Sequence, residues 1–305
     1  MTAPTPPRTG SAGSIYDLGY RGYDGPRLGR RHAVGTLVRD AFRACWGIGR
    51  SGRAKIVPFG LFALAMIPAV VAVGVSALVS QLGEAGGAFD DEAIIGFSSY
   101  FEYVWPLVAL FVAAQAPELV GGDQRHRVLA LLFARALRRE DYAGGKLVAL
   151  VAALLLLLLV PQAVILLGRA LVPADVVEAI VADAAQVPAV IGQAILAAVF
   201  LGSLGLAIAA YTPRRAFATA GIIAVLIVPP LVSAVAVTLV GESTAGWLTL
   251  FSPPDILEGT NAFFFDLTRT SAGRSLPDVA WPLAAMAWSV VAIGALLWRY
   301  RTIQP

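Results

Sequence analysis

The sequence predicts an all-α integral membrane protein with six transmembrane helices and both termini in the cytoplasm. The first observation is composition, because 58% of the 305 residues are hydrophobic and 14% are charged, against about 25% charged in an average soluble protein. The second is a set of long apolar runs, each close to the ~20 residues that a helix needs to cross the hydrocarbon core. The third is charge sorting: 20 of the 23 Lys and Arg residues fall on one side of the predicted spans, which the positive-inside rule assigns to the cytoplasm.

The spans form one membrane domain, which we place at residues 57–298. They are predicted at 57–80, 100–116, 147–167, 189–210, 216–240 and 280–298. They contain one charged side chain, Glu102, and neither histidine. Catalysis or ion coupling inside a membrane requires polar groups there. We therefore expect a protein that is not itself an enzyme, with no catalytic residues and no metal or cofactor bound to this chain.

The N-terminal tail is expected to have two parts. Residues 1–32 are rich in Pro, Gly and Arg without an apolar period, which predicts a disordered cytoplasmic arm. In 33–56, an apolar stripe recurs at helical spacing, through Val34, Leu37, Val38, Ala41, Phe42 and Cys45. This pattern predicts an amphipathic surface helix that lies flat on the inner face of the membrane, followed by a linker. The helix is either a simple anchor or an elbow that also touches a cytoplasmic partner.

The segment 117–146 is unusual for a connector, because an apolar stretch, Val128 to Phe133, is bracketed by charges. We interpret it as a docking loop for a soluble partner, whose arginines can meet carboxylates. The alternative is a solvated loop whose arginines only enforce topology. The docking candidates are Glu118, Asp123, Arg125, Arg135, Arg138, Arg139, Tyr142 and Lys146.

Three further features concern the second half of the chain. The five residues 211–215 predict a tight hairpin between the fourth and fifth spans. Pro229 and Pro230 are expected to kink or break the fifth span, either as a packing feature or as part of a gate or pathway. The long segment 241–279 is expected to be external and to re-enter the membrane in part, and 299–305 to be a cytoplasmic tail.

A transporter built on these spans would have to draw its energy from another subunit. The spans lack charges for ion coupling, and Gly144-Gly145-Lys146 lacks the upstream glycine and the following Ser or Thr of a phosphate-binding loop. The basic balance is explained by topology and anionic inner-leaflet lipid, so no nucleic acid partner is expected.

The order of these elements resembles the permease subunit of exporter-type ABC transporters of the type-2 membrane-domain family. The loop from Asp123 through Arg125, Arg135 and Arg138-Arg139 to Lys146 carries the resemblance, and the start Ile15-Tyr16-Asp17-Leu18-Gly19-Tyr20 looks like actinobacterial members. The resemblance implies two permease copies in the cell membrane and two ATPase subunits that hold ATP and Mg. It also implies a substrate path lined partly by the second and fifth spans.

The nearly uncharged spans suggest export of an amphiphilic, lipid-like or drug-like substrate. Two alternatives remain open at this point. One is a membrane scaffold that recruits a soluble factor, and the other is an ATP-independent carrier or channel.

Overall fold

The computed structural model describes residues 25, 28–82, 95–125, 128–133, 137–171, 181, 183–269, 273 and 275–302. These residues form helices and no strands. Six helices are long and apolar enough to cross a membrane. They are α2 (Gly52–Leu82), α3 (Phe97–Arg125), α5 (Arg139–Ala170), α7 (Val187–Ala210), α8 (Arg215–Val240) and α11 (Ala280–Thr302). The predicted class, an all-α protein with six membrane-spanning helices, is confirmed.

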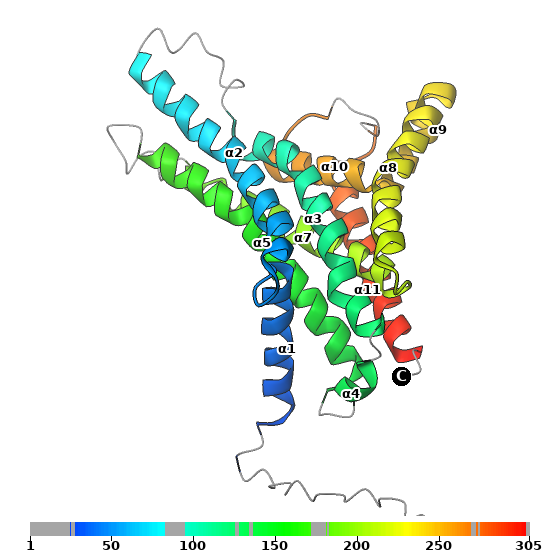
Figure 1. Ribbon diagram of the computed structural model, residues 1–305. Coiled ribbons are helices and arrows are strands. Elements are labelled where there is room, and N and C mark those ends of the chain that lie inside the picture. The colour runs from blue at the N-terminus through cyan, green and yellow to red at the C-terminus, as the bar shows by residue number, and fades with distance from the viewer. Residues whose placement is uncertain are drawn as a thin grey trace, which may run out of the picture.

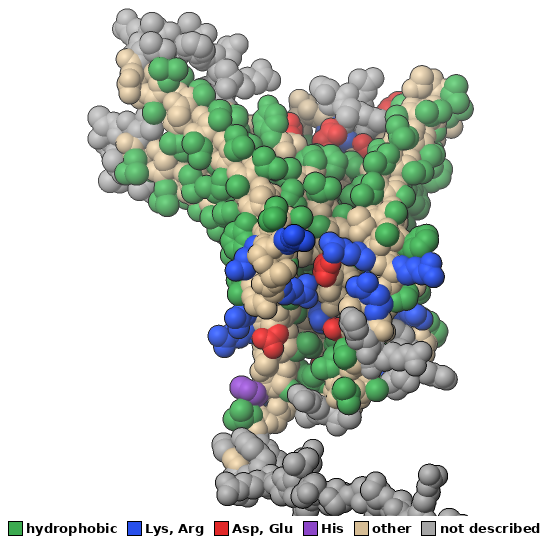
Figure 2. All heavy atoms as spheres, viewed as in Figure 1, with side chains coloured by type: hydrophobic (Ala, Val, Ile, Leu, Met, Phe, Trp, Pro, Cys, Tyr) green, Lys and Arg blue, Asp and Glu red, His purple; other side chains and the backbone are tan. Residues whose placement is uncertain are grey.

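The six long helices form one bundle in which α7 is central, since it packs against α3, α5, α8 and α11. Figure 1 shows α2 and α5 leaning away from α8, so that the bundle is wider at one end. We call the other end, where α3, α7 and α11 finish and α5 and α8 begin, the basic end. Lys and Arg side chains gather there in a band below a broad apolar surface (Figure 2). The start of α1 and the end of α11 both lie toward this end (Figure 1).

The amphipathic helix is present as α1 (Gly29–Cys45). Its apolar stripe is turned toward the bundle, with Ala41 and Cys45 buried, and not toward a membrane surface as predicted. The partner of the stripe is protein, because α1 packs along α5 and the Leu37 side chain lies against Gly145. Figure 1 shows α1 running roughly along the bundle axis and not across it. The helix also begins at Gly29, which is earlier than the boundary at 32; residues 1–24 and 26–27 of the predicted arm lie outside the described residues.

The segment predicted as a docking loop is mostly helical. Its first part, through Arg125, continues α3, and its last part, from Arg139, opens α5. The apolar stretch forms a short helix, α4 (Leu129–Phe133). The loop boundaries 117 and 146 were therefore too wide. The charged residues that suggested a loop lie in the last turns of α3 and the first turns of α5. Several of them, such as Glu118 and Asp123, are paired there, so the helices continue through the charged stretches.

The predicted hairpin between α7 and α8 is confirmed, because α7 ends at Ala210 and α8 begins at Arg215. The helix α8 continues through Pro229 and Pro230 without interruption, so the prolines do not break it. The Ser233 hydroxyl donates to the Pro230 carbonyl at 3.0 Å.

The segment after α8 is folded onto the bundle. It contains α9 (Glu242–Ala245), the 3-10 helix η3 (Gly246–Phe251) and α10 (Pro253–Phe265). Ser252 caps α10 by accepting a hydrogen bond from the Asp255 backbone N–H. The helix α10 packs against α3, α7, α8 and α11, and it lies at the end of the bundle opposite the basic end (Figure 1). Whether this segment enters a membrane stays a prediction.

Candidate functional site

Three side chains from α3 and α5 form a polar cluster at the basic end. The Tyr142 hydroxyl donates to Asp123 Oδ2 at 2.7 Å, and Lys146 Nζ lies 2.9 Å from the same oxygen. Lys146 Nζ also donates to the Leu119 carbonyl at 2.8 Å. Tyr142 is fully buried and Lys146 is 8% exposed, and an ammonium group so far from water is tolerated only when it is paired. The cluster therefore fastens the last turns of α3 to the first turns of α5.

The Glu118 carboxylate joins three segments. Its Oε2 lies 3.2 Å from Arg50 Nη1, in the connection between α1 and α2, and its Oε1 pairs with Arg215 at the start of α8. The Arg50 and Arg215 side chains are about half exposed, so each pair adds about 1 kcal/mol or less to stability. The main consequence is geometric, because the Glu118 carboxylate links the α1–α2 connection directly to the start of α8.

The end of α11 is tied to the same region. Arg301 Nη2 lies 2.6 Å from Glu140 Oε1, and Arg139 Nη1 donates to the Arg301 carbonyl at 2.7 Å. The Gln124 amide of α3 donates to the Tyr300 hydroxyl at 3.3 Å. The ends of α3 and α11 and the start of α5 therefore form one connected unit.

The start of α1 is joined to the start of α5 by a bidentate ion pair between Arg30 and Asp141. Arg30 Nε and Nη2 donate to the two carboxylate oxygens of Asp141 at 2.7 and 2.6 Å. The hydrogen bond to Asp141 raises the pKa of Arg30. Asp141 also accepts from the Arg138 backbone N–H at 3.0 Å, which caps the start of α5.

A groove with about 980 Å³ of space opens between α1, α4 and α5. Its walls are apolar side chains, and its polar groups are those of His32, Thr36, Asp40 and Lys146. The lining residues are His32, Ala33, Thr36, Leu37, Asp40, Ala41, Ala44, Leu132, Leu137 and Lys146. A groove that combines apolar walls with a few charged groups has the composition of a site for a helix or loop of another protein.

The predicted docking residues divide into an internal and an external set. Glu118, Asp123, Tyr142 and Lys146 are engaged inside the bundle by the contacts given above. Arg125 and Arg138 are exposed and Arg139 is half-buried, while Arg135 lies outside the described residues. The assignment of all eight to docking stays a prediction.

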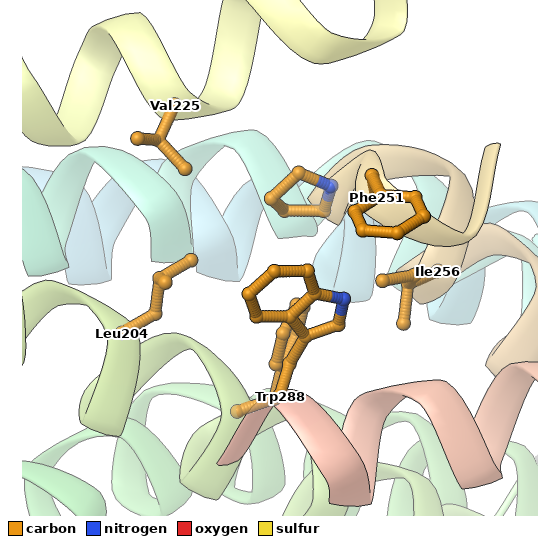
Figure 3. Close-up of a pocket in the computed structure, with 7 residues that line it drawn as sticks. Leu204, Val225, Phe251, Ile256 and Trp288 are labelled. Carbon is orange, nitrogen blue, oxygen red and sulfur yellow. The ribbon is translucent and has the colours of Figure 1, made fainter. Parts of the chain in front are cut away.

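A second site lies near α10, away from the basic end. It is an apolar pocket with about 280 Å³ of space, lined by Phe200, Leu204, Val225, Phe251, Pro253, Ile256 and Trp288. Figure 3 shows these side chains converging from α7, α8, α10, α11 and η3. The Trp288 indole N–H donates to the Leu250 carbonyl at 2.9 Å, which fixes the ring as one wall.

Buried amides lie on two of the helices that line this pocket, α7 and α10. Gln193 Nε2 donates to Asn261 Oδ1 at 2.8 Å, and Asn261 Nδ2 donates to the Ser98 carbonyl at 3.1 Å. Gln193 Oε1, Thr260 Oγ1 and both amide atoms of Gln162 have no hydrogen-bond partner among the described residues. These side chains are at most 2% exposed. These side chains carry no charge and were not predicted as site residues, although Gln and Asn within apolar runs were the available signal in the sequence.

Arg269 was also missed, because nothing in the sequence marks it as buried. Its side chain is 3% exposed, its guanidinium stacks on the Trp281 ring at 3.7 Å, and its Nη1 donates to the Asp255 carbonyl at 3.3 Å. Burial lowers the pKa of Arg269 and raises the pKa of Asp255. This contact attaches the chain after α10 to the starts of α10 and α11.

No protein-family model and no curated protein sequence matches the chain. Within the described ranges, no three His, Cys, Asp or Glu side chains come together as a metal site would require. The function is therefore inferred from the geometry of the two ends of the bundle.

Proposed function

We propose that this chain is the membrane-spanning permease subunit of an ATP-driven ABC exporter, with ATP and Mg bound by a separate ATPase subunit. The observation that carries the proposal is the groove between α1, α4 and α5. It lies where the chain carries most of its Lys and Arg, beside six helices suited to spanning a membrane. A soluble partner seated there would be in contact with the structural unit that holds the ends of the spans.

The contacts at the basic end connect α1 to the ends of α5 and α8, so a displacement of α1 can be transmitted to these spans. A partner that pushes on α1 or α4 acts on α5 through Arg30 and Asp141, and on α8 through Arg50, Glu118 and Arg215. Because helices are stiff, a small tilt at this end becomes a larger displacement at the far end. In our proposal, ATP binding and hydrolysis in the partner drive this tilt and switch the exporter from inward- to outward-facing.

A second copy of the chain completes the proposed exporter. The apolar residues of α8 are the least covered of the six spans, with 11% of the most apolar stretch buried. Large side chains such as Ile227, Leu231 and Val235 are more than half exposed. This surface meets either lipid or the second copy, and we place the second copy there, with the substrate path between the copies.

The test is co-purification with any ATP-binding-cassette protein that an adjacent reading frame encodes, followed by reconstitution. We expect Thr36→Trp, which fills the groove, to reduce the amount of co-purified ATPase at least tenfold. The stimulation of ATP hydrolysis by this chain after reconstitution is expected to fall by the same factor. Arg39→Trp is the matched control, because Arg39 is exposed on α1 outside the groove lining. Equal recovery of the ATPase with both variants would contradict docking in this groove.

The same experiment separates the alternatives. Transport that persists without ATP or an ATPase would indicate a carrier or channel. Capture of a soluble factor with no transport would indicate a scaffold. Either result would reject the exporter proposal.

A further inference from the structure

The helices α7 and α10 run antiparallel along a single seam. Gln193 is hydrogen-bonded to Asn261, and one residue earlier Gly192 faces the Phe264 ring. Continuing this register brings Phe200 opposite Ile256, and both residues line the apolar pocket. The pocket and the buried amides are therefore two parts of the same seam.

The polar groups share helix faces with the pocket. Gln193 precedes Phe200 by seven residues and Thr260 follows Ile256 by four, and both spacings return to the same side of a helix. At 1.5 Å per residue, these groups are about 10 and about 6 Å from the pocket wall along their helices. These distances are within the length of an elongated molecule whose other end lies in the pocket.

The pocket itself suits a hydrocarbon chain. All of its lining side chains are apolar apart from one indole N–H, and that N–H of Trp288 is already bonded to Leu250. A cavity without free polar groups holds apolar matter in preference to water. The pocket is not closed, because part of its space of about 280 Å³ is open to the surroundings, so a hydrocarbon chain can enter it from outside the bundle.

The end of the seam that contains Gln193 and Thr260, which we call the polar end of the seam, is suited to a ligand group that donates a hydrogen bond. The atom of Gln193 without a partner among the described residues is its oxygen, which only accepts, while the Thr260 hydroxyl can accept or donate. Gln162 lies at the same level of the bundle, because Gly202 faces Val151 and Leu154 across the antiparallel pair α5 and α7. Buried polar atoms left unpaired in an apolar surrounding cost stability, so a bound hydroxyl or amide group is favoured there.

We propose that this seam binds an amphiphile with one hydrocarbon chain and an uncharged polar end that carries an O–H or N–H donor. The chain occupies the pocket between α7, α8, α10 and α11, and the polar end hydrogen-bonds to Gln193 and Thr260. The inference deepens the proposed function, on which it rests for the view that this ligand is the exported substrate.

The experiment uses the purified full chain in phosphatidylcholine nanodiscs and needs no ATPase. The probe is a monoacylglycerol with a photoreactive diazirine and an alkyne in its chain. The comparison probe is the methyl ester of the same acid, which has no donor. Crosslinked peptides are located by mass spectrometry. We expect the monoacylglycerol to label the pocket about five- to tenfold more than the ester, as one added hydrogen bond implies.

Two variants and a control separate the two ends of the site. Leu204→Trp fills the pocket and is expected to lower labelling by both probes about tenfold. Val235→Trp, at an exposed position of α8, is expected to change nothing. Thr260→Val keeps the shape and is expected to lower the preference for the monoacylglycerol, because Gln193 is then the one remaining partner of its polar end. No loss of thermal stability is expected, since the variant deletes a buried hydroxyl that has no partner among the described residues.

Labelling of Leu204→Trp at the level of Val235→Trp would overturn the chain site, and an unchanged preference in Thr260→Val would overturn the polar end. These failures are distinct from failure of the exporter proposal. If the chain binds the probe but recruits no ATPase, the proposed site is retained and the exporter proposal is rejected. A chain that exports with an ATPase but is not labelled in the pocket retains the function and loses the site.

Discussion

The cluster of Asp123, Tyr142 and Lys146 offers the sharpest test of how the basic end is held together. We consider Asp123→Asn, Lys146→Met and the double variant. Asp123→Asn keeps an oxygen for the Tyr142 hydroxyl but removes the charge opposite Lys146. Lys146→Met keeps the length of the side chain but removes the ion pair and the bond to Leu119.

The magnitude follows from burial. Breaking a fully buried pair costs about 3–5 kcal/mol, but the side chains of Lys146 and Asp123 are 11% and 29% exposed, so we expect about 2 kcal/mol for each single variant. The double variant leaves no stranded charge and is expected to cost about 2.5 kcal/mol, which gives a coupling energy of about 1.5 kcal/mol.

The assay is equilibrium unfolding of the purified chain in mixed micelles, followed by tryptophan fluorescence. The control is Glu140→Gln, which breaks the exposed pair with Arg301 and is expected to cost about 0.5 kcal/mol or less. If the two single effects add within about 0.5 kcal/mol, the charges are not coupled and our account of this cluster is wrong.

Three more predictions concern single residues. The Cys45 thiol is fully buried and burial raises its pKa to about 12, so maleimide at pH 8 is expected to label the native chain at least 100-fold more slowly than the unfolded one; equal rates would contradict the packing of α1. Burial raises the pKa of Asp255 above its ordinary 3.8, so the protonated form is favoured in the folded protein. Stability is therefore expected to fall as pH rises from below 3.8 through the raised pKa. Asp255→Asn is expected to flatten that part of a pH titration of stability, and an unaltered profile would refute the assignment. Gly205→Ala is expected to cost about 1–3 kcal/mol, because its Cβ would overlap the stiff Val112 side chain, whereas Gly294→Ala meets nothing within 4 Å; similar unfolding midpoints for the two would argue against close contact of α3 and α7.

Local patterns were sufficient for the helices themselves. Long apolar runs predicted all six spans, and the stripe through Leu37, Ala41 and Cys45 predicted α1, because helical periodicity is a property of neighbouring residues. Boundaries were less well predicted where polar residues continue a helix. Glu118 and Asp123 were assigned to a loop, yet they lie on α3, since their charges are met by Arg50, Arg215 and Lys146 from distant segments.

The sequence by itself determined six helices long and apolar enough to cross a membrane, with the basic residues concentrated between alternate spans, because composition and helical periodicity are properties of the local sequence. Only the tertiary structure decided what the polar residues do. It turned Tyr142 and Lys146 inward, opened a groove between α1, α4 and α5, and brought Gln193 beside Asn261 near an apolar pocket. The reason is that a polar side chain is placed by partners from other helices, and the register of those helices arises from packing over the whole bundle.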